Sequence, residues 1–535
     1  MRIVLVNWAP IWDGAGRGGG VNGYAQGLAL ELRDRGHHVS WLSSGLTLTG
    51  GETRVVRHPD WLGIRVFEVV DSPVLAPSIA QFAGPGAEAL SPVLERVFGR
   101  FLARLGPDIV HFHNIEGLSA GCMEEARRTG AAVVYSLHNY HTICPQVYLM
   151  RGHREPCFTP ENGHACSGCI EADDPAQERA RRCVTVASSH LLPTARPRRW
   201  RWGGAESHEP SAEAEAGPGW EEVTPGTVLD RAMPLEHDNR GRTRQVIADR
   251  GPREDIDPLH PHWRPVENEV IPEPSDPRPC NAYGERRLAM VRALNSCDRV
   301  LAVSGFVRER FIAAGVGPER IEVQSIGTRM VSIARLHEEL VFSPPGFEQG
   351  RPVRLVFMGY NNWYKGLPML ADSLELLVPE VLNRLHVFVY ALDGQSMEWR
   401  FRRIEPRLGG LTIHHGYEPH DVPWMLGGKD AGLVTSVWWD NAPQTVFEYQ
   451  ACGLPVIGAA LGGIPEFVRD GVDGLLFRGN DRYDLARVLA RIARDPDLTR
   501  RLRSGVRPPK GMEVHAGEVE QTYQDCVSCA RRSPA

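Results

Sequence analysis

The chain has 535 residues, of which 42% are hydrophobic and 24% are charged, and its formal net charge at pH 7 is -6. This length and composition predict a globular protein of two or three domains. The negative net charge gives no reason to expect nucleic acid as a partner. No apolar run is long enough to span a membrane, and the first residues, MRIVLVNWAP, do not resemble a signal peptide, so we expect a cytoplasmic protein.

The beginning of the chain predicts a βαβ unit of the kind that binds nucleotides. An apolar strand leads through a glycine-rich loop into a helix, and a glycine ends that helix before a second strand. The four segments are residues 2–6, 7–20, 21–35 and 36–42. Gly19 and Gly20 would let the backbone approach a ligand closely, although a flexible loop explains glycines alone equally well. The sequence that follows, up to Pro92, is less regular.

Two further predicted strands end in histidines. The strand at residues 108–113 ends in His113, and the strand at residues 131–137 runs directly into His138. Ligands of α/β proteins bind where parallel strands end, so both side chains are candidates for a site. A lone histidine at such a place is more often a loop hydrogen-bonding group than a catalytic one. Two strands that end in this way favour a functional role.

Four cysteines follow in a short loop that is rich in glycine, proline and histidine. They are Cys144, Cys157, Cys166 and Cys169. Four thiolates ending in a CxxC pair can close a tetrahedral zinc site, with His153, His164 or Cys183 as substitutes. Such a zinc would be structural, because four protein ligands leave no open coordination position. Unligated reduced thiols are the alternative, and they agree with the isolated cysteines elsewhere in the chain.

From residue 193 to 279 the composition changes to proline, arginine, glutamate and glycine, and apolar periodicity disappears. Such a segment cannot bury much core, so we interpret it as a poorly ordered insertion. Its basic and aromatic stretch, residues 196–202, could bind an anionic surface, such as a membrane in a peripheral contact, or nucleic acid, but a solvated surface arm is the simpler interpretation. Regular patterning returns with the helix predicted at residues 285–296, and Ser304 is a candidate N-cap for the next helix.

A second series of strands and helices begins after a proline- and glycine-containing linker. The strands are predicted at residues 354–358, 385–390, 411–415 and 431–435, and the helices at residues 367–377 and 399–408. Lys365 lies in the first loop of this series, just before Gly366 and a helix N-terminus. A lysine, backbone amides and the helix dipole could therefore converge on a diphosphate.

The stretch at residues 436–477 closes this second series and carries two acidic residues. Asp440 lies in a polar loop, and Glu448 lies on the helical run at residues 445–452. Glu448 would suit the two hydroxyls of a ribose, and Asp440 could bind sugar hydroxyls. Because loop and helix start meet at the carboxyl edge of a sheet, the site would suit a ligand with both phosphate and hydroxyls.

Together these motifs resemble the donor domain of retaining, nucleotide-sugar-dependent GT-B glycosyltransferases of family 4. That family has a glutamate pair, then a small-Gly-Leu-Pro-Val strand and a Gly-Gly-x-x-Glu turn. Here Asp440 and Glu448, residues 452–456 and residues 462–466 stand at those positions, and residues 471–477 (GVDGLLF) match the usual sequel. The cysteine loop also resembles one found after the histidine in a subset of the family.

The resemblance covers residues 1–192 and 283–495 and implies an α/β GT-B fold, in which two Rossmann-like domains face each other across a cleft. It divides the chain into an N-terminal acceptor domain with a cysteine-rich loop at 144–183, an insertion, the remainder of the N-terminal domain, a linker, a C-terminal donor-binding domain and a C-terminal tail. These segments are residues 1–192, 193–279, 280–342, 343–350, 351–505 and 506–535.

The resemblance also assigns roles to residues. It implies that His138, Asp440 and Lys365 act in catalysis, with His138 against the transferred sugar and Lys365 against the diphosphate. The residues that it implies for donor binding are Gly19, Gly20, Gly359, Lys365, Gln444, Thr445 and Glu448. Two positions depart from the family pattern: Tyr360 stands where an arginine usually follows Gly359, and Asp440 replaces the first glutamate.

The implied reaction moves a sugar from a nucleotide-diphosphate sugar to an acceptor hydroxyl with retention of configuration, in the synthesis of a polysaccharide, a glycolipid or a glycosylated metabolite. No metal is expected to be needed for the chemistry. Because of Asp440 and Tyr360, a weakly active or inactive nucleotide-sugar-binding relative is one alternative, and a GT-B nucleotide-sugar epimerase is another. A zinc-stapled scaffold that binds partners through the insertion is a third.

Overall fold

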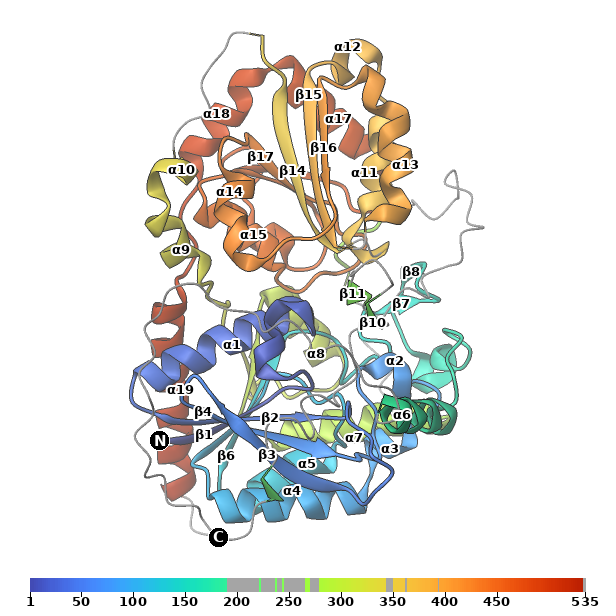
Figure 1. Cartoon of the computed structure of the whole chain (residues 1–535), viewed down its shortest axis with the longest axis vertical. Helices are drawn as coiled ribbons and strands as arrows, with labels where there is room; N and C mark the ends of the chain where they lie inside the picture. Colours follow the sequence, from blue (N-terminus) through green and yellow to red (C-terminus); the bar gives the residue numbers. More distant parts are fainter. Residues whose placement is uncertain are drawn as a thin grey trace.

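The computed structural model describes most of the chain as two α/β domains, one above the other in Figure 1. The described residues are 1–189, 221–222, 236–237, 243–244, 265–269, 279–342, 350–360, 363–392 and 394–532. Most of the predicted insertion and linker, including the basic stretch at 196–202, therefore lies outside the described residues.

The N-terminal domain is built on a nine-stranded sheet of order β13-β12-β6-β5-β1-β2-β4-β3-β9. Its strands are β1 (Arg2–Val6), β2 (His38–Ser44), β3 (Arg54–Trp61), β4 (Ile64–Val70), β5 (Ile109–Phe112), β6 (Ala132–Leu137), β9 (Glu221–Glu222), β12 (Arg299–Ala302) and β13 (Ile321–Val323). All neighbours pair in parallel except β3 and β4. The apolar runs of β1 and β6 are buried, as expected for parallel strands that are covered on both faces.

Helices cover this sheet, and the predicted βαβ unit is confirmed by the parallel pairing of β1 with β2. The helices of the domain are η1 (Ile11–Gly16), α1 (Gly19–Asp34), α2 (Ser78–Gln81), α3 (Gly86–Ala89), α4 (Pro92–Leu105), α5 (Gly121–Arg128), η2 (Glu161–Cys166), α6 (Pro175–Ser189), α7 (Ala282–Ser296) and α8 (Gly305–Ala313). The next two helices, α9 (Met330–Leu336) and α10 (Glu338–Phe342), lie against helices of the C-terminal domain (Figure 1). Ser304 caps α8 as predicted, because its side chain accepts a hydrogen bond from Val307 N. Two small antiparallel pairs complete the described part: β7 (Met150–Arg151) with β8 (Glu155–Pro156), and β10 (Glu236–His237) with β11 (Thr243–Arg244).

The C-terminal domain has a six-stranded parallel sheet of order β16-β15-β14-β17-β18-β19. Its strands are β14 (Val353–Tyr360), β15 (Leu385–Leu392), β16 (Gly410–His414), β17 (Ala431–Val434), β18 (Val456–Ala459) and β19 (Gly474–Phe477). Its helices are η3 (Trp363–Lys365), α11 (Leu367–Glu375), α12 (Pro379–Leu382), α13 (Gln395–Ile404), η4 (Glu405–Arg407), η5 (Pro419–Asp421), α14 (Val422–Leu426), α15 (Gln444–Ala451), α16 (Ile464–Phe467), α17 (Arg482–Arg494) and α18 (Pro496–Gly505). The strand order reverses at β14, where a ligand site of an open α/β sheet is expected.

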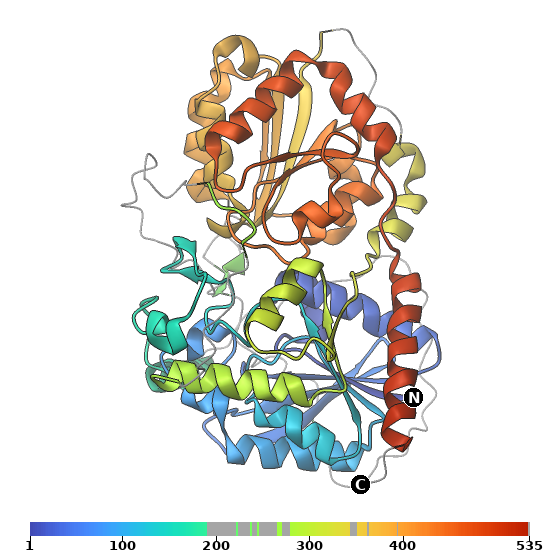
Figure 2. The ribbon, with the colours of Figure 1, turned by 180° about the vertical axis from the view of Figure 1, so that it is seen from behind.

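The last helix, α19 (Met512–Arg532), returns to the N-terminal domain. Figure 2 shows it running along that domain, and it packs against α1 and β6. One face of the helix is buried, with Met512, Ala516, Val519, Tyr523 and Cys526 at helical spacing. Residues 512–532, within the segment 506–535 that was expected to form a tail, thus form a helix that packs on the N-terminal domain.

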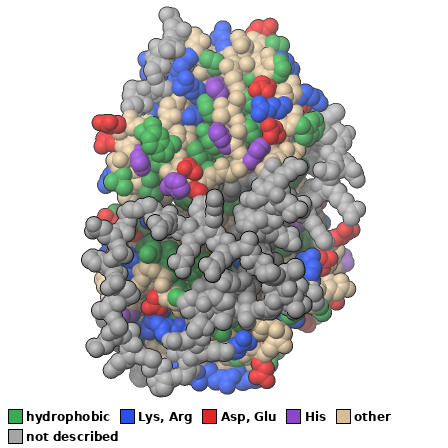
Figure 3. Space-filling view, in the orientation of Figure 1, with side chains coloured by type: hydrophobic (Ala, Val, Ile, Leu, Met, Phe, Trp, Pro, Cys, Tyr) green, Lys and Arg blue, Asp and Glu red, His purple; other side chains and the backbone are tan. Residues whose placement is uncertain are grey.

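Within the described part of the chain, the structure contains no helix that combines the length and the apolar character needed to cross a membrane. The space-filling view shows acidic, basic, histidine and hydrophobic side chains interspersed over the described C-terminal domain (Figure 3). Charge on this face is therefore mixed.

One contact between the two domains is made by a carboxylate of the C-terminal domain that caps a helix of the N-terminal domain. Glu466, in the Gly-Gly-x-x-Glu turn of the C-terminal domain, accepts hydrogen bonds from Gly305 N and Phe306 N at the start of α8, both at 2.7 Å. A negative charge at a helix N-terminus satisfies otherwise unpaired N–H groups and interacts favourably with the helix dipole.

Replacement of Glu466 is therefore expected to weaken the contact between the domains. Glu466→Ala should lower the free energy of unfolding by about 1–2 kcal/mol, and Glu466→Gln by less, because the amide keeps an acceptor but loses the charge. Urea unfolding measures both values. Glu285→Gln, which removes an exposed acid from the first turn of α7, is the matched control. Equal effects at the two positions would contradict the role of Glu466 between the domains.

Candidate functional site

The glycine-rich start of α1 and the η1 segment before it face the C-terminal domain directly. The Tyr360 hydroxyl donates a hydrogen bond to Ala15 O at 2.6 Å, and its ring lies 3.8 Å from the position that a Cβ at Gly19 would take. A Cβ at Gly20 would come within 2.8 Å of the Gln444 side chain. A larger side chain at Gly20 would collide with the start of α15. The structure thus brings together Gly19 and Gly20 with Gln444 and Thr445, which form the first turn of α15.

Lys365 and Asp440 form an ion pair in this structure. Lys365 Nζ lies 2.8 Å from Asp440 Oδ2, and Ser436 Oγ donates to the same oxygen at 3.0 Å. The Asp440 residue is only 5% exposed, so the lysine is the cation that balances a buried carboxylate. Gly359, at the end of β14, lies beside this lysine: a Cβ there would be 3.9 Å from Lys365 Cγ. Two predicted catalytic residues are therefore in direct contact.

The Gly-Gly turn fixes the loop that carries Asp440. Gly462 has a φ of +59°, and a Cβ on it would lie 2.1 Å from Asp440 O. Gly463 N donates a hydrogen bond to that same carbonyl at 2.8 Å. Only glycine combines a left-handed backbone with this close approach. The two glycines are thus required by the position of the Asp440 backbone.

Glu448 lies in the second turn of α15 and is half-buried. Burial raises its pKa to about 7, and the positive charge of Lys365 acts in the opposite direction. The carboxylate is therefore held at a desolvation cost in the ligand-free protein. Hydroxyl donors of a bound ligand would stabilise the charged form by hydrogen bonding to it.

His138 lies at the end of β6 within a group of buried histidines and tyrosines. Its Nε2 atom is 3.2 Å from His113 Nδ1, and the ring centroids of His138 and Tyr24 are 4.6 Å apart. Tyr24 in turn bonds to His515 of α19 at 2.6 Å. Burial lowers the pKa of His138 to about 3, so the ring is neutral at physiological pH. His138 can therefore donate or accept a hydrogen bond there, but it does not supply a positive charge.

Sequence patterns did not identify Tyr24 and His515 as neighbours of His138. The two residues are separated by 491 positions, and their contact exists only because α19 packs on α1. His113 was a candidate because it ends a strand, and the structure places it against His138.

The four predicted zinc ligands lie near one another in the cysteine loop, here defined as residues 144–169. Burial raises the pKa values of Cys144, Cys157 and Cys166, and further increases come from neighbouring cysteines of the same group. Cys169 Sγ accepts a hydrogen bond from Gly152 N at 3.3 Å. Among the described residues, however, the structure shows no group of three or more His, Cys, Asp or Glu side chains arranged to hold a metal ion. The zinc site stays a prediction.

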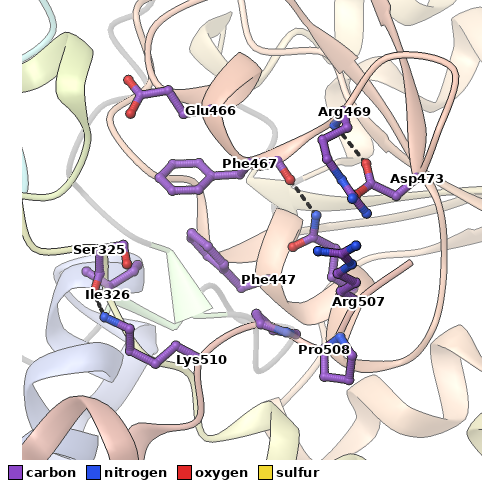
Figure 4. Close-up of a pocket in the computed structure, with 12 residues that line it drawn as sticks. Ser325, Ile326, Phe447, Glu466, Phe467, Arg469, Asp473, Arg507, Pro508 and Lys510 are labelled. Atoms are coloured by element: carbon purple, nitrogen blue, oxygen red, sulfur yellow. Dashed lines mark hydrogen bonds and ion pairs between the residues drawn. The ribbon is translucent and has the colours of Figure 1, made fainter. Parts of the chain in front are cut away.

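A separate hollow of about 280 Å³ lies beside α15 and α16, next to the segment that leads into α19 (Figure 4). Its basic residues are Arg469, Arg507 and Lys510, of which Arg469 pairs with Asp473 at 2.6 Å and Lys510 pairs with Glu518. None of the predicted donor-binding residues lines this hollow.

Known glycosyltransferase families match this chain in both of its halves. Residues 352–495 match the family profile "Glycosyl transferases group 1", and residues 19–191 match "Glycosyl transferase 4-like domain". A D-inositol 3-phosphate glycosyltransferase of Thermobifida fusca is 44% identical over 192 residues, which cover 34% of this chain and 44% of that protein. The putative colanic acid biosynthesis glycosyltransferase WcaL of Salmonella typhimurium is 28% identical over 206 residues, which cover 37% of this chain and 48% of that protein. The chain thus spans about half the length of the curated relatives that it matches.

Solved structures show the same fold. HepE of Anabaena, in complex with UDP, matches with a TM-score of 0.52 at 15% identity, over 98% of this chain and 100% of that chain. Sucrose-phosphate synthase of Thermosynechococcus elongatus matches with a TM-score of 0.54 at 14% identity, over 99% and 100%. The fold is therefore GT-B, as predicted. With both halves matched by family profiles, the chain belongs to the group 1 glycosyltransferases of the family 4 type.

Proposed function

We propose that this protein is a glycosyltransferase that moves a sugar from a nucleotide-diphosphate sugar to an acceptor hydroxyl, with retention of configuration. The observation that carries the proposal is the meeting, between two facing domains, of the glycine turn at Gly19 and Gly20, the start of α15, and the Lys365–Asp440 pair. HepE, which shares the fold, was solved with UDP, and the matched relatives are named glycosyltransferases.

In this proposal α15 holds the nucleotide. Its N-terminal turn, at Gln444 and Thr445, offers backbone N–H groups and the positive end of a helix dipole to the phosphates. Glu448, one turn further along, accepts hydrogen bonds from the ribose hydroxyls. Those donors favour the charged carboxylate, so nucleotide binding lowers the raised pKa of Glu448. The absence of side chains at Gly19 and Gly20 allows the backbone at the start of α1 to approach the start of α15, where the phosphates would bind.

The chemistry in this proposal depends on charge and position. As the bond between the sugar and the diphosphate breaks, negative charge develops on the leaving group, and Lys365 and the start of α15 stabilise it. The acceptor hydroxyl attacks from the same face of the sugar. Asp440 competes with the diphosphate for Lys365, since the two are paired at 2.8 Å without ligand. The neutral His138 contributes a hydrogen bond to the transferred sugar.

A panel of nucleotide sugars tests the proposal. UDP-glucose, UDP-N-acetylglucosamine, GDP-mannose and ADP-glucose would each be assayed for thermal shift and for release of nucleoside diphosphate, with and without candidate acceptors. A stabilising nucleotide sugar that is also turned over would support a transferase. Binding without turnover would indicate an inactive relative, and conversion of the donor without any acceptor would indicate an epimerase.

We further propose that the cysteine loop holds a structural zinc and that the transfer itself needs no metal. Brief EDTA treatment should leave turnover unchanged, whereas a mercurial that displaces zinc from thiolates should release the metal and lower the melting temperature. Zinc release is followed with a chromogenic chelator. Immediate loss of activity in EDTA that magnesium restores would contradict the first expectation, and absence of released zinc would contradict the second.

A further inference from the structure

The cysteine loop of the N-terminal domain packs on the segment that carries Lys365. The rings of Tyr148 and Tyr364 are stacked, with centroids 3.8 Å apart and an angle of 16° between their planes. His153, in the same loop, makes a hydrogen bond through Nδ1 with the Tyr364 hydroxyl. Tyr364 is only 6% exposed and directly precedes Lys365 in η3.

The same loop also packs on the segment that carries Asp440. The Tyr148 ring meets the Trp438 ring edge-on with centroids 5.0 Å apart, and Phe158 meets Trp439 in the same way at 5.0 Å. Trp439 is fully buried and directly precedes Asp440. Tyr148 thus contacts both segments that bring the lysine and the aspartate together.

The backbone on both sides of Tyr148 is strained. Val147 has a φ of +80° and Leu149 a φ of +52°, although neither residue is glycine. A left-handed conformation is a particular outlier for a β-branched residue such as Val147. Residues persist in such conformations only where the surrounding structure holds them, and they cluster at functional sites. The cysteine loop therefore holds both neighbours of Tyr148 in unfavourable backbone conformations while the Tyr148 ring packs on the other domain.

The backbone of Lys365 is held in place by the residues on either side of it. On one side Tyr364 is stacked against Tyr148, and on the other side Gly366 has a φ of +74° and packs so closely on Thr435 that a Cβ would lie 1.7 Å from its carbonyl oxygen. Loss of the Tyr148 ring would leave one of these two anchors unsupported. A charged group that moves by about 1 Å can cost a large factor in rate.

We propose that Tyr148 is a positioning residue for sugar transfer, through which the cysteine loop aligns Lys365 and Asp440 across the domain boundary. The inference rests on the proposed function. It gives the cysteine loop a role in the reaction without any contact with the nucleotide. Tyr148 acts by packing on Tyr364 and Trp438, so its ring matters and its hydroxyl does not.

The cysteines influence Tyr148 indirectly, because their backbone groups help to set the conformation of the loop. Val147 N donates to Cys144 O at 2.9 Å, and Cys157 N donates to Leu149 O at 2.7 Å, so backbone next to two cysteines fixes both strained residues. Disruption of the thiols of these two cysteines, by Cys144→Ser with Cys157→Ser, should therefore have the same effect as loss of the Tyr148 ring. When two changes act through one element, their effects are not additive.

The test compares Tyr148→Ala with Tyr148→Phe, in the full chain, on the nucleotide sugar that the wild type turns over in the panel. Tyr148→Ala should lower kcat at least ~10-fold and change the KM for the donor by less than about 3-fold, since Glu448 and α15 still hold the nucleotide. Tyr148→Phe should stay within about 3-fold of wild type in both constants. Tyr483→Ala, which removes an exposed tyrosine from α17, is the matched control.

Several results would overturn the inference. An equal loss of kcat in Tyr148→Phe would show that the hydroxyl touches the substrate, and a loss in KM alone would place Tyr148 in donor binding. Additive effects of Tyr148→Ala and the double cysteine change would separate the thiols from Tyr148. If Tyr148→Ala fails to fold, Tyr148→Leu provides the same comparison. An inactive wild type would overturn the proposed function and this inference with it, whereas an active wild type with an equally active Tyr148→Ala would overturn the inference alone.

Discussion

Lys365→Ala is expected to lower turnover by at least ~10-fold. The lysine is the cation closest to Asp440, at 2.8 Å, and in the proposed reaction it stabilises charge on the leaving diphosphate. A hydrogen bond to a charged group contributes about 1.5–3 kcal/mol, which corresponds to a factor of ten or more in rate. The measurement is steady-state release of nucleoside diphosphate. Lys365→Arg should retain part of the activity because it keeps the charge.

The same change is expected to reduce stability, since it removes the cation that pairs with the buried Asp440 carboxylate and leaves the neutral hydroxyl of Ser436 bonded to it. A double variant, Lys365→Ala with Asp440→Asn, separates the two effects. It should recover much of the lost melting temperature but none of the lost turnover. Lys429→Ala, in which the removed ammonium group lies over the Phe388 ring, is the control for loss of a lysine. Full turnover in Lys365→Ala would contradict a role of this residue in the reaction.

Glu448→Gln is expected to weaken donor binding by at least ~10-fold while it stabilises the ligand-free protein. The amide keeps the shape of the side chain but loses the charge that accepts two ribose hydrogen bonds. It also removes the cost of holding a carboxylate where burial has raised its pKa to about 7. Calorimetric titration with the nucleoside diphosphate measures the first effect, and thermal unfolding measures the second.

The stabilisation should depend on pH in a defined direction. Folding raises the pKa of Glu448, so between its unfolded value of about 4.3 and its folded value of about 7 the folded protein binds more protons than the unfolded chain. The wild-type carboxyl therefore destabilises the fold increasingly as pH rises through this window, and fully above it. The melting temperature of Glu448→Gln should exceed that of wild type at pH 8, and the difference should shrink towards pH 5.

Glu380→Gln, which replaces an exposed glutamate of α12, should show neither the loss of donor binding nor the pH-dependent gain. Two outcomes would count against the site. Unchanged nucleotide affinity in Glu448→Gln would contradict the proposed contact between Glu448 and the ribose. A stability difference that is independent of pH would show that Glu448 has the same pKa in the folded and unfolded states.

The two sheets could be predicted from the sequence because parallel strands that are buried on both faces form continuous apolar runs. The runs at β1, β6 and β17 are of this kind, and glycines mark the ends of their helices. The antiparallel pair β3 and β4 was missed and taken as irregular. Its strands carry charged and polar residues such as Arg57, because they lie near the edge of the sheet.

The individual residues of the candidate site could also be predicted from the sequence. Glycines at Gly19 and Gly462, the lysine ahead of α11 and the acidic residue on α15 each have a local sequence signal. The residues that each of them contacts in the folded protein have no such local signal. The sequence placed Lys365 on a diphosphate, and the structure pairs it with Asp440, a residue that lies 75 positions away.

The sequence by itself thus determined the fold class, because apolar periodicity, glycine turns and helix starts are local properties of a chain, and the resemblance of its motifs indicated the family and the candidate residues of a donor site. Only the tertiary structure decided which groups meet: Tyr360 with Ala15, Glu466 with the start of α8, α19 with α1, and the cysteine loop with Tyr364 and Trp438. These contacts join segments far apart in the chain. They arise from packing within the N-terminal domain, for α19 with α1, and from the packing of one domain on the other for the rest, and no short sequence motif encodes the partner.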